Sequence, residues 1–234
     1  MAELTQPATI LSSTYLTPHV RQLIVLPKIQ RVFFKPGQWV SLQLPVGEKP
    51  PLNRAYSMAE PPAPSGQLTL VFDRVKDGIG SHYLYGLKAG DELLLSGPYG
   101  NFQLPLSLNQ DLLFISRYTG LVPIRCMLKG LEASGVLPQS VLIAVGPTED
   151  DWLYHDELLA LAVRHPSFRY LPVAVNGMDQ EVVEATVKLL RPLVSGRPRM
   201  TTLLSGVKEF VRPLRAYFVE AGYGRKEVKT ETYN

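Results

Sequence analysis

The pattern of apolar residues changes once along this chain of 234 residues, and that change constrains the fold more than any other feature. Up to about residue 104, apolar residues form short runs rich in β-formers, separated by turns rich in proline and glycine. This pattern is typical of an antiparallel barrel or sandwich. The clearest runs cover residues 20–26, 39–44, 68–75 and 92–96. We therefore expect an all-β first half.

From about residue 105 onward, short apolar runs alternate with longer helical segments. Such alternation predicts parallel strands joined by right-handed crossovers, with ligands in the crevice beyond the carboxyl ends of the strands. The expected strands are residues 112–116, 141–145, 168–173 and 201–204, and the expected helices are residues 122–133, 154–163, 181–190 and 208–221. The second half therefore has the pattern of a nucleotide-type α/β domain.

Composition narrows the classes of protein and site. The net charge of +3 is spread along the chain, so no clustered Lys and Arg indicate nucleic-acid binding. Cys126 is the only cysteine, which excludes an internal disulfide and any four-cysteine zinc or iron–sulfur site built from this chain. His82, His155 and His165 lack metal-like spacing, so we expect no metal site. Without a signal sequence at the start or an apolar run of about 18 residues, we expect a cytoplasmic protein with no membrane span.

Four segments of the first half occur in a recognisable order. They are Phe-Lys-Pro-Gly-Gln-Trp-Val at 34–40, Arg-Ala-Tyr-Ser at 54–57, Gly-Ile-Gly-Ser at 78–81 and Gly-Pro-Tyr-Gly-Asn-Phe at 97–102. With the α/β pattern behind it, this series resembles the ferredoxin–NADP reductase-like family of flavoproteins over nearly the whole chain. The resemblance implies two domains. Residues 1–108 would form a six-stranded antiparallel FAD-binding β-barrel, and residues 109–234 an NAD(P)-binding-like α/β domain with a parallel sheet.

The resemblance also implies roles for individual residues around the flavin. Tyr56 would lie against the flat isoalloxazine, where stacking contributes roughly 0.5–1.5 kcal/mol beyond area burial. Ser57 would place a hydroxyl near the redox-active nitrogen, which makes Tyr56 and Ser57 the expected catalytic residues. Arg54 would grip the diphosphate with a planar fork of donors. The amides of the turn at 78–81 and the Ser81 hydroxyl would hold phosphate oxygens.

The expected flavin-binding set is Arg54, Ala55, Tyr56, Ser57, Arg74, Gly78, Ile79, Gly80, Ser81, Thr119 and Tyr233. Of these, Tyr233 lies in the C-terminal tail, which either covers the flavin or frays at the surface. The turn at 78–81 favours FAD over FMN.

The second half departs from the family at its first strand-to-helix turn. A Gly-Gly-Thr-Gly-type turn is replaced by Arg117-Tyr118-Thr119-Gly120, so two large side chains stand where the family has glycines. Either Arg117 supplies a positive charge for a diphosphate while Tyr118 stacks, or both residues fill a nucleotide site that has been lost. The expected NADH or NADPH contacts are Arg117, Thr119, Gly120, Gly146, Ser205 and Gly206. No arginine in residues 145–150 supports selectivity for NADPH.

The resemblance predicts an FAD-dependent NAD(P)H oxidoreductase of the ferredoxin or flavin reductase type. It would accept a hydride from NADH or NADPH and pass electrons to a separate acceptor: a small iron–sulfur protein such as a ferredoxin, an oxygenase component, free flavin or a quinone-like molecule. The alternative is a flavin-binding electron carrier, sensor or assembly subunit with a degenerate nucleotide site and no turnover. An oligonucleotide-binding barrel is disfavoured, because clustered basic residues interleaved with aromatics are missing.

Overall fold

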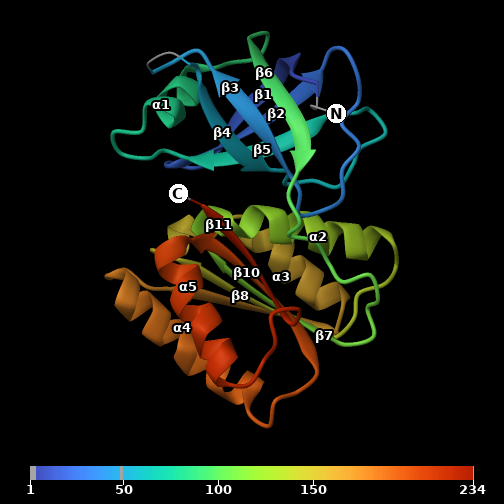
Figure 1. Ribbon diagram of the computed structural model, residues 1–234, viewed down its shortest axis with the longest axis vertical. Coiled ribbons are helices and arrows are strands. Elements are labelled where there is room, and N and C mark those ends of the chain that lie inside the picture. The colour runs from blue at the N-terminus through green and yellow to red at the C-terminus, as the bar shows by residue number, and fades with distance from the viewer. Residues whose placement is uncertain (1–3, 48–49, 234) are drawn as a thin grey trace. The chain divides into compact units, whose positions relative to one another are not determined.

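The structure, a computed structural model, describes residues 4–47 and 50–233. Residues 1–3, 48–49 and 234 lie outside the described residues. Part of the N-terminal segment in which no signal sequence was found, and the last residue of the C-terminal tail, are among them. Contacts between residues divide the chain into two units, Met1–Gln103 with Arg125–Gly130, and Leu104–Ile124 with Leu131–Asn234 (Figure 1). Each unit has its own sheet.

The first unit is an antiparallel barrel. Its strands are β1 (Gln6–Thr17), β2 (Val20–Pro27), β3 (Trp39–Leu44), β4 (Leu52–Ser57), β5 (Leu68–Asp73) and β6 (Glu92–Tyr99), and they follow the order β4-β3-β6-β1-β2-β5. The two outer strands of that order meet just after β4. There Met58 forms an antiparallel bridge with Leu70, and the amide of Ala59 donates to the carbonyl of Thr69 at 2.8 Å. These contacts close the sheet, and the expected six-stranded barrel is confirmed.

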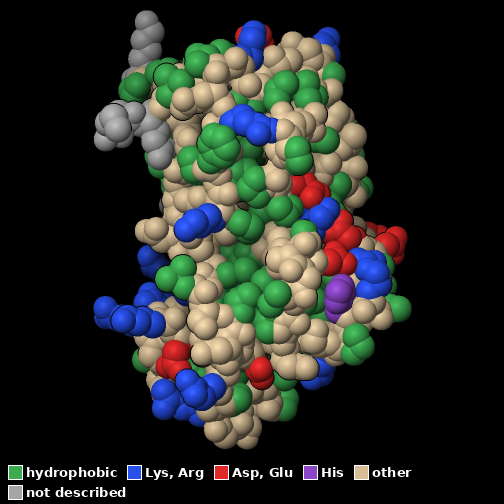
Figure 2. Space-filling model, turned by 90° about the vertical axis from the view of Figure 1, so that its right-hand side faces the viewer, with side chains coloured by type: hydrophobic (Ala, Val, Ile, Leu, Met, Phe, Trp, Pro, Cys, Tyr) green, Lys and Arg blue, Asp and Glu red, His purple; other side chains and the backbone are tan. Residues whose placement is uncertain are grey.

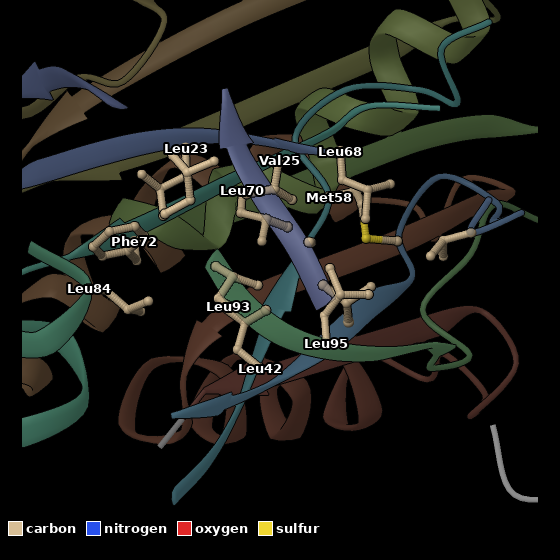
Figure 3. Close-up of a cluster of buried hydrophobic side chains, with 14 of the residues drawn as sticks. Leu23, Val25, Leu42, Met58, Leu68, Leu70, Phe72, Leu84, Leu93 and Leu95 are labelled. Carbon is tan, nitrogen blue, oxygen red and sulfur yellow. The ribbon is translucent and has the colours of Figure 1, made fainter. Parts of the chain in front are cut away.

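Side chains that alternate along the strands fill the barrel. On β3, Val40, Leu42 and Leu44 are fully buried, while the residues between them are partly exposed, as a period of two requires. Figure 3 shows how leucines from several strands converge with Met58 and Phe72 on one apolar interior. The helix α1 (Ile79–Gly86) adds Leu84 to the same core.

The second unit is a parallel sheet with helices. Its strands are β7 (Asp111–Arg117), β8 (Ser140–Gly146), β9 (Phe168–Ala174), β10 (Met200–Val207) and β11 (Val228–Tyr233), in the order β11-β10-β7-β8-β9. Its helices, visible in Figure 1, are α3 (His155–Arg164), α4 (Asp179–Val194) and α5 (Lys208–Glu220), with short 3₁₀ turns η1 (Tyr118–Gly120) and η2 (Glu149–Asp151). The helix α2 (Leu121–Ala133) belongs to this unit at both ends, while its residues 125–130 belong to the first unit. The order reverses between β7 and β10, which is where ligands of open α/β sheets bind.

Burial explains why these segments fold as parallel strands. Almost every residue of β7 and β10 is buried, as expected for strands covered by helices on both faces. The helices are amphipathic instead: Phe210, Leu214 and Phe218 recur at helical spacing on α5, and all three are buried. The expected parallel α/β architecture is confirmed.

The expected elements agree with the observed ones apart from their ends. The helix α1 begins at Ile79, inside the turn expected at residues 78–81, and α4 extends at both ends beyond the expected 181–190. The C-terminal tail is a strand, β11, that pairs in parallel with β10. Residues 228–233 are therefore not a frayed tail, because their backbone groups belong to the sheet.

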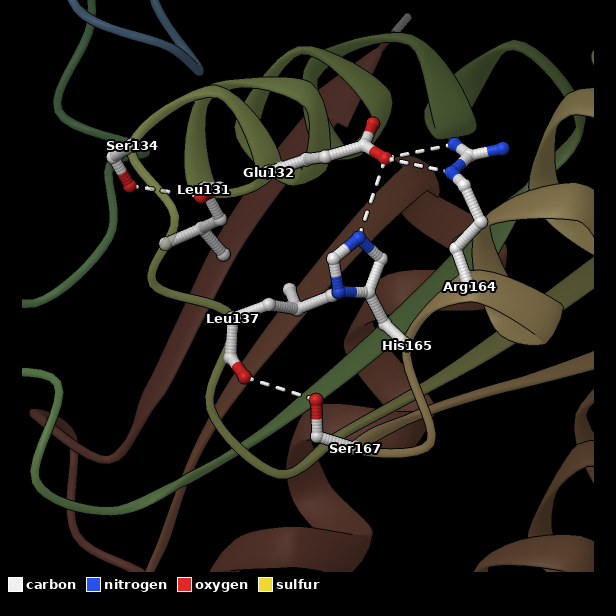
Figure 4. Close-up of polar contacts among 7 residues, drawn as sticks. All are labelled: Leu131, Glu132, Ser134, Leu137, Arg164, His165 and Ser167. Carbon is white, nitrogen blue, oxygen red and sulfur yellow. Dashed lines mark hydrogen bonds and ion pairs between the residues drawn. The ribbon is translucent and has the colours of Figure 1, made fainter.

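One histidine takes part in an ion-pair cluster at the surface, and charged side chains are spread over the face drawn in Figure 2. His165 Nε2 lies 3.3 Å from Glu132 Oε1, which also accepts from Arg164 at 2.7 Å, so these side chains tie the end of α2 to the end of α3 (Figure 4). On the face drawn in Figure 2, basic side chains of the described residues are interspersed with polar and apolar ones. No helix in the described ranges is long and apolar enough to cross a membrane.

Candidate cofactor-binding site

Strand β4 presents Arg54 and Tyr56 on one face. Residues two apart on a strand point the same way, and the β3 partners of these two residues, Leu42 and Val40, are buried core residues. Arg54 is exposed and donates from Nη1 to the neighbouring carbonyl of Asn53 at 2.9 Å. Among the described residues no carboxylate pairs with this guanidinium, so its fork is available to an anion.

The ring of Tyr56 is held from one side. It meets Phe72 edge to face, with 5.8 Å between the ring centroids, and packs against the barrel core. Burial, with a smaller contribution from the charge of Asp73, raises the pKa of Tyr56 to about 12. The phenol therefore stays neutral at physiological pH, and a neutral aromatic side chain suits a flat apolar ligand.

Ser57 and Ala55 lie on the other face of β4. Ser57 is buried, with 4% of its surface exposed, and it precedes the Met58 bridge that closes the barrel. Ala55 is exposed. The Met58 bridge just after Ser57 fixes the backbone at this end of β4.

The turn before α1 lies beside Arg54. A Cβ built on Gly80 would come 3.1 Å from Leu52 Cδ2 and 3.7 Å from Arg54 Cγ, so the first turn of α1 packs directly against the arginine stem. The amides of Ile79, Gly80 and Ser81, at the start of this helix, have no partner within the helix. The stem of Arg54 and the first turn of α1 thus lie side by side.

The Ser81 hydroxyl forms hydrogen bonds within its own turn. It accepts from the amide of Val75 at 3.2 Å and donates to the carbonyl of Gly78 at 2.9 Å, so its single proton is used inside the turn. Ser81 holds the turn in shape and can offer a ligand its backbone amide. Arg74, one residue after β5, is exposed and its guanidinium lies 5.6 Å from the centre of the Tyr85 ring.

The second unit brings five of the expected nucleotide contacts together where β7 and β10 run side by side. Gly120 is buried against the end of β10, and a Cβ there would collide with the carbonyl of Ser205. Gly206 has a φ of 152°, which favours glycine, and its Cβ position lies 3.1 Å from Arg117 Cβ. Thr119 is half-buried in the η1 turn between them.

The two large residues of the turn have defined positions. Arg117 pairs through Nη1 with Oδ1 of Asp179, the first residue of α4. Tyr118 has a φ of 51°, in the left-handed region where glycine is favoured, so the family's glycine at this position has a conformational reason. Sequence reasoning missed Asp179, because it is 62 residues from Arg117.

Gly146 lies one strand further, at the carboxyl end of β8. It lines a cavity of about 10 Å³ together with Ser116, Tyr118 and Trp152, among others. A cavity of this size holds at most one water molecule. On the β8 side of the turn, Tyr118 and Trp152 therefore leave little empty space.

The end of β11 lies next to β10. Tyr233 pairs in register with Val207, and its hydroxyl is 3.5 Å from Ser205 Oγ. Glu231 pairs in register with Ser205, and burial raises the pKa of its carboxyl to about 7. The burial of Glu231 could not be predicted from the sequence, because it follows only from the position of the strand. The expected contacts of Tyr233 and Thr119 with the flavin stay predictions.

A closed six-stranded barrel with an exposed arginine beside a glycine turn, followed by a parallel α/β unit, defines the class of two-domain flavin-binding oxidoreductases. Residues 8–104 match the oxidoreductase FAD-binding domain family. Ferredoxin–NADP reductase B of Sorangium cellulosum is 34% identical over 94% of this chain and 93% of its own length. The chain belongs to the ferredoxin–NADP reductase-like family of FAD-binding oxidoreductases.

Other similar proteins include one that is longer than this chain and two solved structures. The reductase component of phenol 2-monooxygenase from a Pseudomonas species is 35% identical over 70% of this chain, and this chain spans 46% of that relative. Among solved structures, ferredoxin-NADP⁺ reductase from Plasmodium falciparum has a TM-score of 0.79, 19% identity and 99% coverage of both chains. The Amycolatopsis cytochrome P450 reductase has a TM-score of 0.83 and 21% identity, covering 98% of this chain and 69% of its own. At these identities the two structures establish the fold.

Proposed function

We propose that this protein is an FAD-dependent NAD(P)H oxidoreductase that passes electrons to a separate acceptor. The observation that carries the proposal is the packing of Gly80 against the stem of Arg54. Because of it, the stem of Arg54 lies beside the start of α1, whose first amides have no partner within the helix. A diphosphate is a ligand that can use both groups at once.

The barrel residues fit FAD in their chemistry as well as in their placement. Arg54 offers the diphosphate a guanidinium that no carboxylate of the described residues pairs with, and Tyr56 offers a neutral ring backed by Phe72. Ser57, fixed by the strand closure behind it, would donate or accept a hydrogen bond at the ring edge. Bound FAD would supply the ability to take up a hydride and release electrons one at a time. The protein's own task is to orient the ring and keep it there.

The second unit would present the nicotinamide nucleotide. Gly120 allows the η1 turn to approach β10, and Ser205 and Tyr233 place two hydroxyls 3.5 Å apart at the end of that strand. Arg117 would meet the diphosphate, and Gly206 leaves room beside its stem. In this interpretation the nucleotide site is retained, although two glycines of the family turn are replaced.

The electron acceptor would be a separate protein or molecule. Cys126 is buried and is the only cysteine of the chain, so no iron–sulfur cluster can be built from this chain. The names of the relatives from Sorangium and Pseudomonas point to ferredoxin and to an oxygenase component, respectively. We propose a small iron–sulfur protein of one of these two kinds as the partner.

Two measurements on the purified protein test the proposal. Heat should release FAD, which separates from FMN by chromatography. Anaerobic addition of NADH or NADPH should then bleach the visible flavin absorbance. A yellow protein that neither nucleotide reduces would instead support the electron carrier, sensor or assembly subunit without turnover. A protein that takes up no flavin, even when flavin is supplied in excess, would contradict both.

A further inference from the structure

We propose that Asp179 acts as a gate on the nucleotide site by holding Arg117 away from an incoming diphosphate. The inference rests on the function proposed above. Its basis is the ion pair between Arg117 Nη1 and Asp179 Oδ1, which occupies the only guanidinium of the turn at the β7–β10 switch point. A diphosphate must therefore compete with the Asp179 carboxylate for this guanidinium.

The position of Asp179 is set by its helix. It is the first residue of α4, and its neighbour Glu181 accepts from the amide of Met178 at 2.8 Å across the helix start. Carboxylates are favoured at this end of a helix, because the helix dipole is positive there. Two negative charges thus already lie at the start of α4, and they disfavour the binding of an anion there.

The geometry of Arg117 makes the exchange of partners possible. Its Cβ lies against Gly206, so the stem is fixed close to the backbone of β10, while 24% of the side chain is exposed. The Asp179 side chain is 49% exposed. A half-exposed pair of this kind is weak and can open. The guanidinium can then turn to a phosphate without any movement of the strand.

The gate acts on the part of the nucleotide that NADH and NADPH share. Asp179 would weaken the binding of both to the same extent, because both carry the same diphosphate. The cost to binding has two parts: the broken Arg117–Asp179 pair, and repulsion between the freed carboxylate and the phosphates. Asp179 would therefore set the nucleotide affinity of this chain without selecting between its two possible co-substrates.

The test compares D179N with the wild type in the flavin-loaded protein. Calorimetric titration with ADP-ribose measures diphosphate binding without hydride transfer, and titrations with NAD⁺ and NADP⁺ follow. We expect D179N to lower the Kd for all three about three- to fivefold, the size expected for loss of a half-exposed pair. In an R117Q background the D179N effect should disappear. E184Q removes the same charge from the same helix, at a residue bonded to Gln180, and should leave the Kd unchanged.

Each outcome decides between the proposals. Equal Kd values for D179N and the wild type would overturn the gate while leaving the oxidoreductase proposal intact. A similar gain in E184Q would overturn it too, because the effect would then come from net charge. Binding of the three probes by D179N but not by the wild type would support the gate, because Asp179 would then keep the wild-type site closed. If no variant binds any of the three probes and NADH fails to bleach the flavin, both the gate and the nucleotide site are refuted.

Discussion

Gly120 packs so closely against Ser205 that a side chain at position 120 would collide with the Ser205 carbonyl oxygen. The two residues belong to the turn after β7 and to the end of β10, and their contact sets the distance between the two sides of the switch point. The expected nucleotide contacts can lie together only because this approach is possible.

Replacement of Gly120 by alanine should therefore destabilise the second unit. The added methyl group meets backbone rather than a flexible side chain, so we expect a loss of about 1–3 kcal/mol in the free energy of unfolding. Urea denaturation followed by circular dichroism measures it. Gly86→Ala is the control, because a Cβ at Gly86 meets nothing within 4 Å. Equal stability of the two variants would show that the turn yields without cost.

Arg54 should determine flavin affinity. Arg54→Ala removes the fork that faces the diphosphate, and we expect the Kd for FAD to rise roughly 10- to 100-fold. Arg54→Lys keeps the charge but loses the bidentate geometry, so its Kd should fall between those of the wild type and the alanine variant. Fluorescence titration of the flavin-free protein gives these values. Arg31→Ala removes another exposed arginine of the first unit, and a comparable loss there would argue against a specific role for Arg54.

Glu231 should make stability depend on pH. Burial raises the pKa of its carboxyl to about 7, from an ordinary value near 4.5. Between these values the folded protein binds more protons than the unfolded chain, so the free energy of unfolding should fall as pH rises from about 4.5 to about 7. In Glu231→Gln this component of the fall should vanish.

The measurement is a series of urea denaturation curves across that pH range. Glu220→Gln, at the exposed end of α5, serves as the control and should keep the wild-type pH dependence. A Glu231→Gln curve parallel to that of the wild type would mean that the carboxyl titrates normally.

Glu60 should be important for the stability of the first unit. It pairs with Lys129 at 2.7 Å and with Arg125 at 2.8 Å, and the Arg125 side chain is only 4% exposed. Burial alone would raise the pKa of Glu60, but the hydrogen bonds and charges of Lys129 and Arg125 outweigh it and lower that pKa. The stabilisation is therefore present above the unfolded-state pKa and is lost as pH falls below it.

Glu60→Ala removes a carboxylate that pairs with the buried guanidinium of Arg125, and we expect a loss of roughly 2–4 kcal/mol in the free energy of unfolding at pH 7. Glu92→Ala, which breaks an ion pair with Lys28 that is about half exposed, should cost less than about 1 kcal/mol. Thermal denaturation compares the two. If Glu92→Ala cost as much as Glu60→Ala, burial of Arg125 would not be the source of the stability.

The sequence by itself determined the order of the two architectures and the residues of the flavin motif. These features are local: a period of two or of 3.6 residues, and a short segment such as 54–57, can be recognised without knowing what packs against them. The sequence did not determine which distant residues pair with one another. Closure of the barrel through Met58 and Leu70, the strand position that buries Glu231, and the contact of Arg117 with Asp179 were decided by the tertiary structure. The reason is physical, because burial and charge pairing depend on which segments meet in space, and the strand order of a sheet does not follow the order of the chain.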